Sequence, residues 1–409
     1  MSERIVTLPS GLIVAVEPMS NTRTAAIGVY VGVGGRHDPA GHAGTSHFLE
    51  HVLFKGTARR GAIEISQAVD RLGGDINAYT SKEYTAFYCR VPARHAATGI
   101  GLIGELVTEP ALRPADIEGE RQVILEELAM DDDTPDDVAH QAFSAALFPH
   151  HPLGCDTAGD RQTVNAITAE SLTEFFQSTY HTGNAVVAVA GAVDPDQVVE
   201  QVTEAFAPMP QGAGRLSSTV PTTQPAWGTV VLDDDTEQTH IVTGGRALPR
   251  DDADREALDV VNHVFGGGLS SRLFDEIRER RGLAYSVASS AVAFGDAGAW
   301  SVYAGTMPQH ADAVCDLIDV ELHRLVSFGI TAEELEIARG YLTGSFEMGL
   351  EDSGARMARL GGQLLLRGEV RACDDQLARW DAVTLDDTRK VIERVYAGET
   401  ITIRLGPAA

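Results

Sequence analysis

The chain has 409 residues, of which 44% are hydrophobic and 22% are charged, and this composition excludes an intrinsically disordered protein. Its formal net charge of −27 argues against binding to nucleic acid or to an anionic membrane surface, because both require a basic footprint. Basic peptides would be attracted to this charge, although solubility or a salty cytoplasm explains it equally well. There is no apolar run of about 20 residues, and residues 1–7 are typical of a strand and not of a signal peptide. We therefore expect a cytoplasmic protein with no membrane segment.

The first half of the sequence predicts strands and helices in separate groups. Two hydrophobic stretches flank Pro9-Ser10-Gly11 and predict a hairpin, and a third β-like run ends at Gly34-Gly35. A helix begins near residue 43, and the next helix ends at Gly73-Gly74. The other expected segments are strands at 75–80, 84–91 and 185–190 and helices at 93–108, 114–130, 135–147, after 168 and at 194–206.

The second half repeats the order of the first. Residues 207–227 are rich in Pro, Gly, Ser and Thr and predict a linker. The elements expected after it are strands at 229–232 and 240–243, helices at 255–265 and 270–280, a hairpin of 284–293 and 299–304, and a last strand at 401–405. A period of about 200 residues indicates a duplicated domain. We expect an α+β fold with mainly antiparallel sheets, in which residues 1–210 and 228–409 form two similar halves joined by 211–227.

One pentapeptide has the spacing of a metal site. His47 and His51 are four residues apart on a predicted helix, so their side chains share one face and can chelate one Zn²⁺. Glu50 lies at the edge of that face, where it can accept a proton from water without binding the metal. A surface histidine pair is the alternative, but buried His and Glu side chains need a partner such as a metal. The neighbours that favour burial are Phe48, Leu49, Val52, Leu53 and Phe54.

A catalytic zinc site needs a third protein ligand, and the acidic helix at 118–127 offers candidates. Glu127 follows Ile124 and Val123 by three and four residues, which places it on an inward apolar stripe. Glu120 lies two turns earlier on the same stripe, where it can orient an imidazole. Glu126 is rotated about 100° away and is expected in solvent. Spacing therefore favours Glu127 as the ligand without excluding the other choice.

Four segments together resemble the pitrilysin or insulysin superfamily of inverted zinc metallopeptidases, and in particular its branch related to the mitochondrial processing peptidase, which includes bacterial processing proteases. The His-x-x-Glu-His order is inverted, and the last Glu of ERQVILEE follows His51 by 76 residues. The resemblance extends over essentially the whole chain. Its four segments are SHFLEHVLFKGT at 46–57, GGDINAYTSKEYTAFY at 73–88, ERQVILEE at 120–127 and GGGLSSRLFDEIRERRGLAYSV at 266–287.

The resemblance implies a zinc endopeptidase with one zinc per chain, bound by His47, His51 and Glu127, with Glu50 as the general base. It implies that the second half lacks metal and contributes Arg278 for substrate binding and Tyr285 for the oxyanion. It also implies two chains that close like a clamshell around an unfolded peptide or presequence. The strand expected to pair with that peptide comprises Asn77, Ala78, Tyr79 and Thr80.

Two rival interpretations remain. Some members of the superfamily have lost catalysis and act as structural or regulatory subunits, and others are active only beside a different, non-catalytic chain. No ligand position departs from the active pattern here, and the long glycine-rich loop of the non-catalytic subunits is absent from the sequence. The sequence does not specify the physiological substrate or distinguish a homodimer from a heterodimer.

Overall fold

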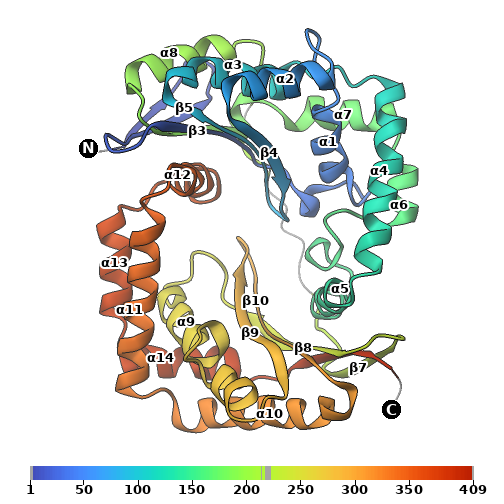
Figure 1. Ribbon diagram of the computed structural model, residues 1–409, viewed down its shortest axis with the longest axis vertical. Coiled ribbons are helices and arrows are strands. Elements are labelled where there is room, and N and C mark those ends of the chain that lie inside the picture. Colours follow the sequence, from blue (N-terminus) through green and yellow to red (C-terminus); the bar gives the residue numbers. More distant parts are fainter. Residues whose placement is uncertain (1–2, 213, 217–222, 408–409) are drawn as a thin grey trace. The chain divides into compact units, whose positions relative to one another are not determined.

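The computed structural model describes residues 3–212, 214–216 and 223–407, so parts of the expected linker at 211–227, namely residues 213 and 217–222, lie outside the described residues. The chain forms two compact units (Figure 1). Unit 1 comprises residues 1–129, 155–218 and 347–370, and unit 2 comprises 130–154, 219–346 and 371–409. Residues 347–370, from the second half of the sequence, therefore belong to unit 1, and residues 130–154, from the first half, belong to unit 2.

A six-stranded sheet forms the centre of unit 1, in the order β1-β2-β6-β3-β5-β4. All neighbouring strands are antiparallel except the parallel pair β2 and β6. The continuous apolar sequences of β3 and β6 are buried on both faces, as expected of strands covered from two sides. The strands are β1 (Arg4–Thr7), β2 (Ile13–Pro18), β3 (Thr24–Val31), β4 (Asp75–Thr80), β5 (Thr85–Pro92) and β6 (Ala185–Gly191).

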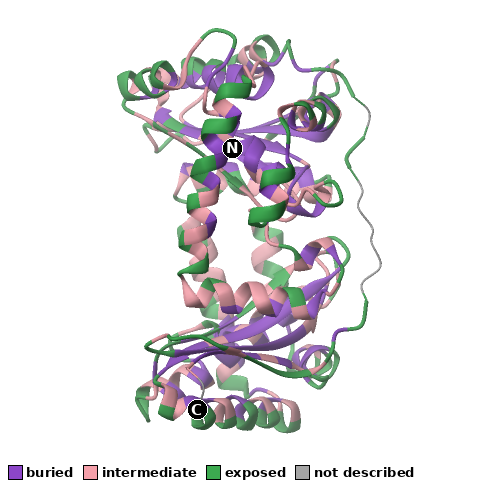
Figure 2. Ribbon diagram, turned by 90° about the vertical axis from the view of Figure 1, so that its right-hand side faces the viewer, coloured by how far each residue is buried: buried purple, intermediate pink, exposed green. Residues whose placement is uncertain are grey.

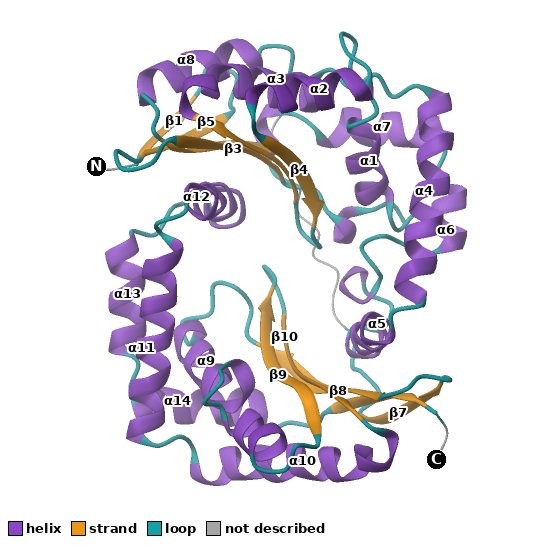
Figure 3. Ribbon diagram, in the orientation of Figure 1, coloured by secondary structure: helices purple, strands orange, loops and turns teal. Residues whose placement is uncertain are grey.

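Helices cover both faces of this sheet (Figures 1 and 3). On one face, α3 packs on β3 and β5, α8 packs on β2, and α1 lies beside β4. On the other face, α12 packs on β3 and β6, where a Cβ added to Gly361 would come within 2.1 Å of the Tyr30 ring. The helices of this unit are α1 (Thr45–Leu53), α2 (Ala62–Leu72), α3 (Ala96–Thr108), α4 (Pro114–Asp132, whose last three residues are assigned to unit 2), α6 (Arg161–Ala166), α7 (Ala169–Thr179), α8 (Pro195–Ala205) and α12 (Ser353–Arg367).

Two arginines of α12 form ion pairs with glutamates near the start of the chain. Arg356 pairs with Glu17, and Arg359 pairs with both Glu3 and Glu17. Glu17 is only 4% exposed, so these guanidinium groups compensate a carboxylate that burial alone would destabilise. A helix from the second half of the sequence is thus an integral part of unit 1.

Unit 2 contains a five-stranded sheet in the order β7-β11-β8-β10-β9. Its pairing senses, one parallel pair followed by three antiparallel pairs, repeat those of β2-β6-β3-β5-β4 in unit 1. The predicted α+β duplication is therefore confirmed. The strands are β7 (Gly228–Asp233), β8 (Thr239–Ala247), β9 (Ala284–Ala293), β10 (Gly298–Thr306) and β11 (Ile401–Gly406).

The buried strands of both sheets are visible in Figure 2. In unit 2, α5 packs against β8 and β11, while α10 contacts β8 and β10. In the described part of the chain, every helix is too short or too polar to span a lipid bilayer. The α-helices of unit 2 are α5 (Pro135–Leu147), α9 (Arg255–Asn262), α10 (Ala311–Phe328), α11 (Ala332–Gly349, whose last three residues are assigned to unit 1), α13 (Cys373–Ala382) and α14 (Leu385–Val391), and its π-helical segments are His263–Gly267, Phe274–Glu279 and Ile392–Tyr396.

Candidate metal centre

The helix α1 carries the pentapeptide, and specific backbone and side-chain contacts stabilise its N-terminus. Gly44 precedes it with a φ of 94°, a conformation that glycine adopts without strain. The Asp38 carboxylate accepts hydrogen bonds from the backbone N–H of Gly44 at 2.7 Å and of Ser46 at 2.9 Å, which satisfies donors that the first helical turn leaves unpaired. The side chains of Phe48 and Leu49 are fully buried in the core. The helix is therefore held in place while one face remains for polar groups.

The structure brings the three expected ligands together. His47 Nε2 and His51 Nε2 are 3.2 Å apart, and Glu127 Oε2 lies 3.9 Å from the first and 3.5 Å from the second. Two donor atoms bound tetrahedrally at about 2.1 Å from a zinc ion lie roughly 3.4 Å apart. These three residues also form the single cluster of metal-binding side chains found in the described part of the chain. The donor set and its spacing fit zinc.

Glu120 and Glu127 both extend from α4, two turns apart. Glu120 is 5% exposed, and its Oε1 lies 3.0 Å from His51 Nδ1, on the ring nitrogen opposite the metal-facing one. Its other oxygen forms an ion pair with Lys55. Lys55 lies in the turn just after the end of α1 and was not among the predicted site residues. Ile124 is buried as predicted, but Val123, which was expected on the same inward stripe, is 46% exposed.

Burial sets the protonation states around the cluster. Burial, and to a lesser degree the neighbouring His51, lower the pKa of His47 to about 4, so its imidazole is neutral at neutral pH, as metal binding requires. Burial also raises the pKa of Glu50, against the opposing effect of the hydrogen bond from Thr80. A carboxylate with a raised pKa is better suited to accept and return a proton near neutrality.

The strand β4, which contains Asn77, Ala78, Tyr79 and Thr80, lies beside α1 and ends the sheet. Its residues alternate between exposed and half-buried, and the half-buried Ala78 packs on the core. Among the described strands β4 pairs only with β5, so its outer edge can accept a further strand. The position of this edge next to the pentapeptide agrees with its expected role in substrate binding, which stays a prediction.

Arg278 and Tyr285 belong to unit 2. The Arg278 guanidinium carbon lies 4.7 Å from the ring centres of both Phe274 and Tyr285. Tyr285 is 80% exposed on β9, so its hydroxyl is available to a ligand. Their proposed roles in binding substrate and oxyanion stay predictions.

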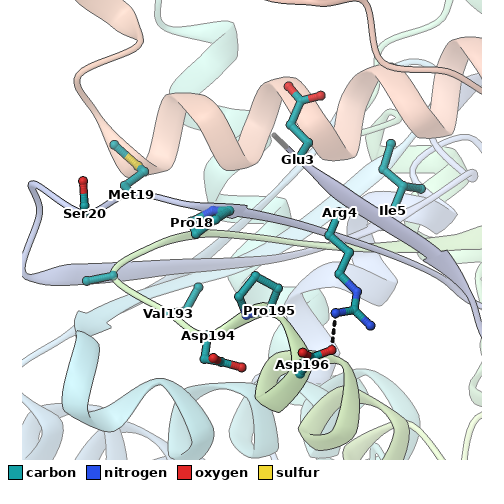
Figure 4. Close-up of a pocket in the computed structure, with 11 residues that line it drawn as sticks. Glu3, Arg4, Ile5, Pro18, Met19, Ser20, Val193, Asp194, Pro195 and Asp196 are labelled. Atoms are coloured by element: carbon teal, nitrogen blue, oxygen red, sulfur yellow. Dashed lines mark hydrogen bonds and ion pairs between the residues drawn. The ribbon is translucent and has the colours of Figure 1, made fainter. Parts of the chain in front are cut away.

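A cavity of about 1010 Å³ in unit 1 has a different lining (Figure 4). Its walls come from the ends of β1, β2 and β6 and the start of α8, and Arg4 and Asp196 form an ion pair there. It includes none of the residues expected in the metal centre. Its other charged groups are also engaged, since Glu3 pairs with Arg359 and Asp194 caps the N-terminus of α8, and we assign the cavity no part in the chemistry.

Comparison with known proteins assigns the chain to a family. Residues 13–161 match the profile described as insulinase (peptidase family M16), and residues 166–342 match the peptidase M16 inactive domain. An uncharacterized zinc protease of Streptomyces coelicolor is 40% identical over 415 residues, which cover 99% of this chain and 89% of that protein. The chain belongs to peptidase family M16. An uncharacterized zinc protease of Bacillus subtilis is 32% identical over 404 residues, with 98% of both chains covered.

Solved structures show the same fold for this M16 chain. A protease from Helicobacter pylori superposes with a TM-score of 0.93 at 25% identity, covering 99% of this chain and 100% of that one. A Pseudomonas fluorescens structure described as a peptidase M16 inactive domain gives a TM-score of 0.93 at 20% identity, covering 100% and 98%. His47, His51 and Glu127 fall in the segment matched to insulinase, whereas Arg278 and Tyr285 fall in the segment matched to the inactive domain.

Proposed function

We propose that this M16 chain is a zinc-dependent endopeptidase that binds one zinc ion per chain. The observation that carries the proposal is the convergence of His47, His51 and Glu127 at the spacing of a tetrahedral site, next to the Glu50 carboxylate. Three protein ligands leave a coordination position open, which is the arrangement of catalytic and not of structural zinc. The names of its relatives, which call them zinc proteases, support the same metal and reaction.

Each side chain has a distinct task in this proposal. Zinc, when bound, supplies a Lewis acid that polarises the scissile carbonyl and acidifies water. Glu50 takes the proton from the attacking water and returns it to the leaving amine. Glu120 holds His51 in the orientation that directs its Nε2 to the metal. Tyr285 donates a hydrogen bond to the oxyanion, and Arg278 holds the substrate.

An extended, unfolded peptide or presequence is the proposed substrate. It would add as a strand to the outer edge of β4, which requires a segment without stable structure of its own. We further propose that two copies of the chain enclose the peptide in a closed chamber as a homodimer in the cytoplasm. A different, non-catalytic M16 partner is the alternative assembly.

Metal analysis joined to cleavage profiling tests the proposal. The purified chain should contain one equivalent of zinc, cleave members of a diverse peptide mixture, and lose both properties on treatment with a chelator. Readdition of zinc should restore cleavage. A metal-free protein that does not bind added zinc would contradict the assignment. A chain that binds zinc but cleaves no peptide, either alone or with a homologous partner, would indicate a non-catalytic subunit.

A further inference from the structure

The hydroxyl of Thr80 contacts the proposed general base. Thr80 is the last residue of β4, and its Oγ1 donates a hydrogen bond to Glu50 Oε2. Within the described part of the chain, this is the one hydrogen bond that the Glu50 carboxylate accepts. One carboxylate oxygen is thereby held by the protein, while the other accepts no hydrogen bond from the described residues.

The orientation of this hydroxyl is determined by its surroundings. Thr85 lies opposite Thr80 in the β4–β5 hairpin, and their hydroxyl oxygens are 3.4 Å apart. The Thr85 hydroxyl donates its own proton to the carbonyl of Val33 at 2.8 Å. Thr80 therefore has a carboxylate as its acceptor, and hydrogen bonds to ionised groups are shorter and stronger than those between neutral groups.

The backbone of the same residue is fixed by the hairpin. The strand pair ends at Thr80 and Thr85, and the turn that follows is closed by a hydrogen bond from the N–H of Ser81 to the carbonyl of Tyr84 at 2.8 Å. A donor on such a rigid element locates its acceptor more accurately than a donor on a mobile loop. The edge strand expected to bind substrate thus also fixes the position of Glu50.

We infer that Thr80 is a positioning residue, whose side chain orients the Glu50 carboxylate for proton transfer. The inference rests on the proposed function, in which Glu50 is the base. It goes beyond the expected role of Thr80 in substrate pairing, because that role uses the backbone, whereas this one uses the hydroxyl. The two roles are separable, since Thr80→Val keeps the shape of the strand and removes only the donor.

Kinetics of two matched variants test the inference. We expect Thr80→Val to lower kcat about 10-fold or more while KM changes by less than about 2-fold, because the lost bond affects the proton transfer and not peptide pairing. Thr80→Ser, which keeps the hydroxyl, should restore most of kcat. Zinc content should be the same in both variants. Equal kcat values for Thr80→Val and Thr80→Ser would overturn the inference.

A second measurement does not depend on catalysis. The measurement is a double-mutant cycle in metal-free protein. Thr80→Val should lower the urea midpoint of unfolding when residue 50 is Glu, and it should lower that midpoint less in the Glu50→Ala variant, because directly bonded residues give non-additive effects. Equal shifts in the two backgrounds would contradict the bond. If wild-type protein shows no zinc-dependent cleavage, the proposed function fails, but this cycle still tests the contact between the two side chains.

Discussion

The carboxylate of Glu120 lies 3.0 Å from Nδ1 of His51, the ring nitrogen that faces away from Glu127. This contact orients one of the two imidazoles only, since His47 Nδ1 is buried and has no hydrogen-bond partner among the described residues. Carboxylates that bind the far nitrogen of a metal-binding histidine fix its tautomer and raise its basicity. The His51 ring is therefore preorganised for the metal by Glu120.

Replacement of Glu120 should weaken zinc binding. We expect Glu120→Ala to raise the Kd for zinc about 10- to 100-fold, because the orienting contact to His51 is lost. Competition with a chromogenic chelator measures this affinity. Glu126→Ala is the matched control, because Glu126 lies on the same helix but is exposed. Equal affinities in the two variants would show that Glu120 does not act on the site.

Glu50→Gln should separate metal binding from catalysis. The amide keeps nearly the same shape and can still accept the hydrogen bond from Thr80, but it cannot take a proton from water. We expect kcat to fall by about 10²- to 10⁴-fold or more while one zinc ion remains bound. Turnover of a fluorogenic peptide and metal analysis of the same sample check both parts. Turnover close to that of the wild type would refute Glu50 as the base.

The sequence predicted most of the metal centre because its decisive spacings are local. The four-residue interval of His47 and His51 places both rings on one face of any helix, whatever the rest of the fold. The structure places Glu127 beside both imidazoles, although Val123, which was expected on the same inward stripe, is exposed. The seven-residue interval from Glu120 was the better signal, since it keeps two side chains on one side of a helix.

Contacts between distant segments could not be predicted in the same way. The hydroxyl of Thr80 reaches Glu50 because β4 lies beside α1, and no sequence period specifies that approach. The membership of α12 in unit 1 likewise involves contacts between distant segments, such as the pair of Arg356 and Glu17, which are 339 positions apart. The recurrence of the element order along the chain was predictable, but the helix that covers the second face of each sheet was not.

The ion pairs of α12 predict a large loss of stability when both arginines are removed. The double variant Arg356→Met with Arg359→Met leaves the buried Glu17 without these two partners, and we expect the free energy of unfolding to fall by about 3–5 kcal/mol. Adding Glu17→Met should recover much of this loss, because an apolar side chain needs no partner. Urea unfolding followed by circular dichroism measures the change.

An exposed ion pair of the same unit provides the control. Arg4 and Asp196 pair with each other, and their side chains are 44% and 78% exposed. Arg4→Met should therefore lower the free energy of unfolding by less than about 1 kcal/mol. A similar small cost for the double variant of α12 would mean that these arginines do not compensate Glu17. Both sites lose arginine–carboxylate pairs, so a difference in the loss of stability between them reports the effect of burial and not of charge alone.

Tyr285 is 80% exposed within its own unit, which leaves it accessible to a second chain. If two copies form a shared site, a chain with His51→Ala still supplies an intact Tyr285, and a chain with Tyr285→Phe still supplies an intact metal centre. Mixing the two inactive variants should then restore about a quarter of wild-type activity, since about half of the dimers are mixed and each has one complete site. Native mass spectrometry of differently tagged chains verifies the exchange. Complete exchange without recovered cleavage would place Tyr285 outside the site of the other chain, and the proposed clamshell would then need a different catalytic partner for the metal.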